Sequence, residues 1–210
     1  MNHYSYHFDI NSEPLTTPEL NAELGRLKQI RKTQIKQSCI SDVLHAFVFI
    51  ALYFYQALSG YAVLVAVGIS TVLAILLATL LRNSLSLKDY LLVATMALGG
   101  SGATLLVLWQ IMEQQLPGSL IAACCAASIV VVGATLGRNI KQVMLAIEEM
   151  KPISNDETAV NELRALCAQY PELEAYRSAA AQNLRPHLTY AELATMRAWI
   201  EKQQNKAESS

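Results

Sequence analysis

The stretch Ala62–Ala78 reads AVLVAVGISTVLAILLA, and two of its features decide the fold. It carries no charge and belongs to an uncharged run of 39 residues, Val43–Leu81. A small residue also recurs at every fourth position, namely at Ala62, Ala66, Ser70, Ala74 and Ala78. Residues four apart lie on one face of an α-helix, so the stretch predicts an apolar helix with one thin face.

Two further uncharged runs follow, at Tyr90–Met112 and Leu116–Gly137. A helix of about 20 apolar residues is long enough to cross a bilayer. The run around Ala62–Ala78 would form a helix of about 58 Å, too long for one crossing, and Ser59-Gly60 offers a break. The sequence therefore predicts an all-α, polytopic membrane protein with four transmembrane helices in two antiparallel hairpins, near residues 41–58, 61–81, 90–112 and 118–137. A re-entrant first pair is the alternative.

Lysine and arginine flank the predicted spans on one side only. The two opposite loops, around Gly60 and at 113–118, contain neither residue. Because positive charge is retained in the cytoplasm, the pattern predicts a multi-pass protein of the inner (plasma) membrane with both termini cytoplasmic. Nine basic residues are expected to contact lipid head groups: Arg26, Lys28, Arg31, Lys32, Lys36, Arg82, Lys88, Arg138 and Lys141.

The small-residue stripe has a physical role in lipid. Apolar helices gain little there from hiding leucine, and close contact through small residues drives their packing instead. We therefore interpret the stripe as a seam for another helix. Partner residues of the same kind occur on the third and fourth spans, at Gly99, Gly102, Ala103, Gly133 and Gly137. Packing within one bundle is the simpler interpretation, and a homo-oligomer or a contact with another membrane subunit is the alternative.

The sequence Gly99-Gly100-Ser101-Gly102 resembles the G-x-S-G nucleophile motif of rhomboid intramembrane proteases. The resemblance implies a nucleophile at Ser101 with a histidine base on another span. The only histidine near a span is His45, which is expected at a different depth from Ser101. Rhomboids also have six or more spans, and this chain has four predicted ones. We therefore expect no catalytic residue, and an intramembrane serine protease at Ser101 is the alternative.

The chain divides along the sequence into three predicted parts. Residues 1–40 form a cytoplasmic N-terminal tail and an interfacial helix that starts at Thr17-Pro18-Glu19, with Thr17 as the N-cap. Residues 41–137 form the transmembrane domain, and residues 138–210 form a cytoplasmic helical region.

Within the C-terminal region, the fourth helix is expected to continue past residue 137 and to end before Pro152. Three short helices follow at about 156–169, 171–183 and 189–203. Capping boxes are predicted at Ser154–Glu157 and Thr189–Glu192. A module this small has a limited core and is expected to dock on another surface.

Composition and charge narrow the function. Apolar residues make up 53% of the chain. Residues 138–210 hold nine basic and ten acidic residues without a basic stripe, so nucleic-acid binding is not expected. No cysteine pair has a zinc spacing, and neither a metal nor a cofactor is expected.

The sequence thus predicts an integral membrane scaffold, accessory or regulatory subunit without catalytic activity. It contacts membrane lipids, assembles through its small-residue seams and binds a cytoplasmic protein partner through residues 152–210. The alternative is a homo-oligomeric channel or membrane-permeabilising effector gated by the cytoplasmic tail.

Overall fold

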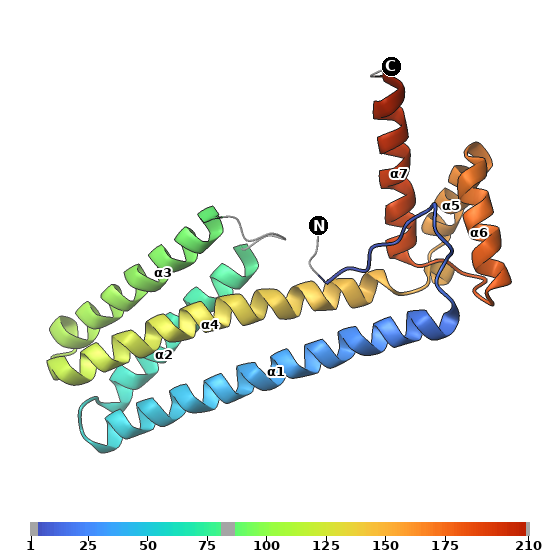
Figure 1. Ribbon diagram of the computed structural model, residues 1–210. Helices are drawn as coiled ribbons and strands as arrows, with labels where there is room; N and C mark the ends of the chain where they lie inside the picture. The colour runs from blue at the N-terminus through green and yellow to red at the C-terminus, as the bar shows by residue number, and fades with distance from the viewer. Residues whose placement is uncertain (1–3, 81–86, 209–210) are drawn as a thin grey trace. The chain divides into compact units, whose positions relative to one another are not determined.

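The computed structural model describes residues 4–80 and 87–208. Within these ranges it contains seven α-helices and no β-strand (Figure 1). The helices are α1 (Thr17–Phe54), α2 (Gly60–Leu80), α3 (Leu87–Leu106), α4 (Leu116–Glu149), α5 (Glu157–Gln169), α6 (Pro171–Gln182) and α7 (Tyr190–Glu208). Helices α1, α2, α3 with its following turn, and α4 are long and apolar enough to cross a membrane. The all-helical class and four candidate spans are therefore confirmed.

Helix α1 is a single helix of 38 residues, so the expected interfacial helix and the first span form one element. Its N-terminus is a capping box one residue earlier than predicted. The Thr16 backbone N–H donates to Glu19 Oε2 at 2.8 Å, and the Glu19 N–H donates to Thr16 Oγ1 at 3.5 Å. Thr16 is therefore the N-cap, because Glu19 lies three residues after it.

The predicted break in the first uncharged run is confirmed, since α1 ends at Phe54 and α2 begins at Gly60. Gln56 in this loop has a positive φ of 53°. The third span ends differently from the regular helix that the sequence predicts. Val107–Ile111 forms a π-helical turn, in which the Met112 N–H donates to the Val107 carbonyl at 2.9 Å. Such a turn inserts one extra residue into the helix, and Leu108 within it is fully buried.

Helix α4 continues to Glu149, as predicted. It and α1 each contribute to two compact units. The apolar unit is Arg31–Gln142, and the helical module consists of the described residues of Asn2–Ile30 and Val143–Ser210. The N-terminal segment thus belongs with the C-terminal helices, a grouping that the division along the sequence does not predict.

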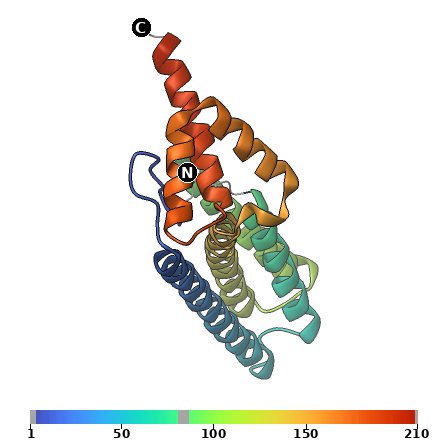
Figure 2. The same ribbon diagram turned by 90° about the vertical axis from the view of Figure 1, so that its right-hand side faces the viewer.

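The helical module has its own buried core, with Leu173, Leu193 and Met196 at its centre. Helix α5 packs against α6 and α7 (Figure 2). The bounds of α5 and α6 and the start of α7 lie within one residue of the prediction, whereas α7 ends at Glu208, five residues beyond its predicted end. The N-terminal segment adds Phe8 and Ile10 to the buried side chains of the module.

Two caps organise the helices of the module. The capping box of Thr189 and Glu192 is confirmed, with the Thr189 N–H donating to Glu192 Oε2 at 2.8 Å. The one predicted at Ser154 is wrong. Asp156 caps α5 instead, because its Oδ1 accepts hydrogen bonds from the backbone N–H groups of Thr158 and Ala159.

The Asp156 cap leads to a pH prediction. The hydrogen bonds from the Ala159 N–H and the Tyr190 hydroxyl lower the pKa of Asp156. Its contribution to stability is therefore complete above its unfolded pKa of about 3.9 and is lost as the pH falls through the lower folded value. We expect Asp156→Asn, which caps without titrating, to reduce the acid sensitivity of the module, whereas Asp156→Ala destabilises it at neutral pH. Thermal unfolding of the full chain in detergent at pH 7 and pH 3 checks this, and identical acid sensitivity in the wild type and Asp156→Asn contradicts it.

Candidate functional site

The small-residue stripe of α2 faces inward in the apolar unit. Ala62, Ala66 and Ser70 are fully buried, Ala74 is 7% exposed, and Ala78 is half-buried. The Ser70 hydroxyl donates to the Ala66 carbonyl at 2.6 Å, which satisfies it within its own helix. The stripe is therefore a packed surface without an unsatisfied hydroxyl.

Two glycines of α4 lie against this stripe. A Cβ added at Gly133 would lie 2.9 Å from the Ala74 Cβ, and one added at Gly137 would lie 3.2 Å from the Ala78 Cβ. These distances leave no room for a larger side chain at Gly133. We call the contact of Ala74 and Ala78 with Gly133 and Gly137 the α2–α4 seam.

The other end of the stripe packs into a mixed cluster. Ala62 and Ala66 are buried there with Phe49 of α1, Leu108 of the π-helical turn and Ala122 of α4. Small residues on α2 thus allow contact with more than one neighbouring helix.

The small residues of α3 are placed differently from the expectation. Gly99, Gly102 and Ala103 are exposed, and a Cβ at Gly99 or Gly102 would meet no atom within 4 Å. Gly100 lies against Leu73 of α2 instead. Within the described part of this chain, Gly99 and Gly102 therefore pack no helix, and a seam with another chain stays a prediction.

Gly99, Gly100 and Ala103 line an open apolar groove of about 720 Å³ between α2 and α3. Gly68 and Val72 form its α2 side, and Gly99 and Ala103 form its α3 side. The groove is a surface that a helix or lipid chain fits.

Ser101 and His45 have separate partners in the apolar unit. The Ser101 hydroxyl donates to the Leu98 carbonyl at 2.9 Å. The His45 ring nitrogens lie 2.7 Å from the Ser41 carbonyl oxygen and 3.1 Å from Ser128 Oγ. The two residues form no hydrogen bond with each other, so this geometry does not support a serine–histidine pair.

Most of the basic residues expected at lipid head groups are exposed: Arg26, Lys28, Arg31, Lys32, Lys36 and Lys141. Arg82 and the side chain of Lys88 lie outside the described residues. Arg138 differs, because it is only 6% exposed. The chain itself encloses this guanidinium, as it does the neighbouring Gln142, so the expected head-group contact of Arg138 does not fit the structure.

A buried ion pair fixes the α6–α7 loop of the module. Arg185 Nη2 lies 2.5 Å from Glu192 Oε2, and the two side chains are 3% and 0% exposed. Glu192 also accepts the Tyr176 hydroxyl at 3.0 Å. Arg185 Nη1 donates to the Leu15 carbonyl at 2.8 Å, which ties the N-terminal segment to the loop.

This network affects the acidity of its members. Burial, followed by the adjacent Glu192 carboxylate, raises the pKa of Tyr176 well above its ordinary value. Tyr176 therefore stays a hydrogen-bond donor at neutral pH. Burial also raises the pKa of the Cys167 thiol to about 11, and a protonated thiol is a poor nucleophile.

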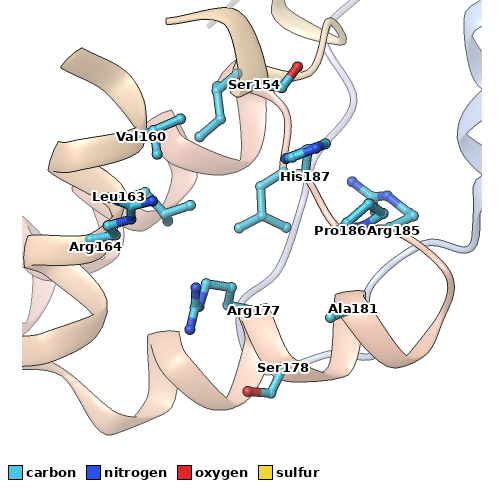
Figure 3. A pocket seen from close by; sticks show the side chains of 12 residues that line it. Ser154, Val160, Leu163, Arg164, Arg177, Ser178, Ala181, Arg185, Pro186 and His187 are labelled. Carbon is cyan, nitrogen blue, oxygen red and sulfur yellow. The ribbon is translucent and has the colours of Figure 1, made fainter. Parts of the chain in front are cut away.

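A basic cavity of about 450 Å³ lies in the module beside this network (Figure 3). Its basic side chains are Arg164 from α5, Arg177 from α6, and Arg185 and His187 from the α6–α7 loop. Ser154 and Ser178 add hydroxyl groups, and none of the lining residues, all of them described, is acidic. We call this site the basic cavity.

The sequence does not indicate the basic cavity, because its residues come from the turn before α5, from α5, from α6 and from the α6–α7 loop, which only the fold brings together. Within residues 4–80 and 87–208, no group of three or more His, Cys, Asp or Glu side chains is placed to hold a metal ion. Compared with family models, curated proteins and solved structures, the chain shows no significant match.

Proposed function

We propose that this chain is an integral membrane scaffold, accessory or regulatory subunit without catalytic activity. The apolar unit anchors it, and the helical module binds a cytoplasmic protein partner through residues 152–210. The observation that carries the proposal is that α1 and α4 each run without interruption through both units. Continuous helical backbone therefore joins the anchor to the recognition module.

The exposed side chains of the apolar unit support an embedded anchor. Leu64, Val72, Ile75, Leu98 and Ile111 are each at least 60% exposed within the chain. Large exposed apolar surfaces are rare on soluble monomers, whereas lipid tails cover such surfaces without cost.

We place the four spans as two antiparallel hairpins in the inner (plasma) membrane, with both termini cytoplasmic. The positive charge on one side of the spans supports this orientation. Aromatic side chains at the opposite loops, among them Tyr55 and Tyr61, are 87% and 79% exposed and fit a belt at the outer interface.

The open groove between α2 and α3 supports a homo-oligomer or a contact with another membrane subunit. The groove is also consistent with the second candidate function, a homo-oligomeric channel or membrane-permeabilising effector, because a ring of such chains would surround a central path. Gly99 and Ala103 would then meet another helix at close range.

A flux measurement separates the two functions. We expect full-length protein reconstituted in liposomes to leave the efflux of K⁺ and of a small fluorescent dye equal to that of protein-free liposomes. The reason is that a scaffold needs no water-filled path through the bilayer. A flux that increases with protein density contradicts the scaffold and supports the channel.

A Gly99→Leu variant identifies the assembly surface, since it should lower the oligomer mass in nanodiscs only if the α2–α3 groove holds the contact.

A further inference from the structure

The arginines of the helical module differ in one respect that points to a ligand. Of the five in its described residues, four form an ion pair with a glutamate: Arg26, Arg177, Arg185 and Arg197. Arg164 has no ion pair or hydrogen bond with any described residue. It lines the basic cavity, where its donors are available to an anion.

The neighbouring basic groups also keep unused donors. Arg177 uses Nε and Nη2 for Glu174, at 2.9 and 2.6 Å, and its other donors are not engaged by the described residues. Arg185 uses its two terminal nitrogens, and its Nε is buried without a hydrogen-bond partner.

The rest of the cavity suits an anion that carries an apolar part. Ser154 and Ser178 also line the cavity, and each hydroxyl donates a long hydrogen bond of 3.4 Å to a neighbouring side chain. Val160, Leu163 and Leu188 form an apolar wall. At about 450 Å³ the cavity is in the size range of small-molecule sites.

We propose that the basic cavity binds a phosphate monoester, with Arg164 and Arg177 as its principal ligands. Guanidinium groups bind phosphate oxygens in pairs, with planar geometry and charge-assisted hydrogen bonds. The shared chemistry is a terminal phosphate on a partly apolar body, either free in solution or as the head group of an anionic lipid. The cavity lies within residues 152–210, the segment proposed above to bind a protein partner, but phosphate binding does not require that contact.

The test uses the full chain, purified without phosphate in a neutral detergent. The first arm titrates inorganic phosphate and glycerol 3-phosphate by calorimetry. For the second arm, the protein is first transferred into nanodiscs of phosphatidylcholine alone. Its binding is then measured to separate, protein-free nanodiscs of phosphatidylcholine with and without phosphatidic acid. Saturable binding in the first arm identifies a soluble ligand, and binding confined to phosphatidic acid identifies the lipid.

The decisive comparison is between Arg164→Gln and Arg197→Gln. Both remove one positive charge from an exposed arginine of the module, but only Arg164 lines the cavity. We expect Arg164→Gln to weaken binding about tenfold, as the loss of one charge-assisted contact implies, and Arg197→Gln to leave it within about twofold. Absence of saturable binding in both arms overturns the proposal, as does an equal loss in the two variants.

Discussion

Replacing Glu192 with alanine is expected to unfold the helical module while the apolar helices keep their helical content. Glu192 is fully buried and holds Arg185, Thr189 and Tyr176. Without it the Arg185 guanidinium stays buried and unpaired, which costs about 3–5 kcal/mol. A loss of that size is a large part of the stability of a small domain, which is typically about 5–15 kcal/mol. Hydrogen exchange and limited proteolysis of the full chain in detergent measure it, with faster exchange in α6 and α7 as the expected result.

Two matched variants make this prediction specific. Glu162→Ala removes a glutamate from the Arg197 pair, whose side chains are 34% and 53% exposed, and it should cost less than about 1 kcal/mol. Replacing both buried partners together, with Arg185→Met and Glu192→Leu, should recover much of the stability, because no uncompensated charge remains. Equal protection in the wild type and Glu192→Ala contradicts the structural role of the pair.

Replacing Gly133 with leucine should separate α2 from α4. An added Cβ at Gly133 would already lie 2.9 Å from the Ala74 Cβ, so a leucine fits only if the helices move apart. Overpacking of this kind costs about 1–3 kcal/mol and occasionally more. The unfolding temperature in detergent, followed by circular dichroism, is expected to fall.

Gly68→Leu is the matched control for Gly133→Leu. Gly68 lies in α2, and an added Cβ there would meet no atom within 4 Å. Both variants gain the same helix propensity, about 1 kcal/mol, so in monomeric, detergent-solubilised protein a difference between them reports the α2–α4 seam. A double variant that combines Gly133→Ala with Ala74→Gly should restore the contact, because it moves the methyl group from α2 to α4 without adding volume. If Gly133→Leu and Gly68→Leu unfold at the same temperature, the seam does not determine the packing.

The helices of the apolar unit could be predicted because their signal is local. An uncharged run long enough to cross a bilayer is visible in the sequence alone, and the fourfold spacing from Ala62 to Ala78 marks the buried face of α2. On α3 the same reasoning selects Gly99, whereas Gly100 makes the contact. Adjacent residues lie on different faces of a helix, and the position of the neighbouring helix determines which of the two glycines is packed.

The remaining features depend on contacts between distant segments. Phe8 and Ile10 are buried in the module although their segment has no periodicity. Arg138 resembles the other basic residues that flank the spans, yet it is buried. Arg164 and Arg177 line the same cavity only because α5 packs against α6.

The proposed function requires a chain that crosses the membrane four times and keeps the module in the cytoplasm. Single cysteines at Tyr55, Gln115 and Leu184, in a variant without the native cysteines, test it with a membrane-impermeant maleimide. Tyr55 and Leu184 are 87% and 85% exposed, and Gln115 is also exposed. We expect labelling of Tyr55→Cys and Gln115→Cys in intact cells, and of Leu184→Cys only after permeabilisation. Labelling of Leu184→Cys in intact cells, or recovery of the chain in the soluble fraction, would contradict it.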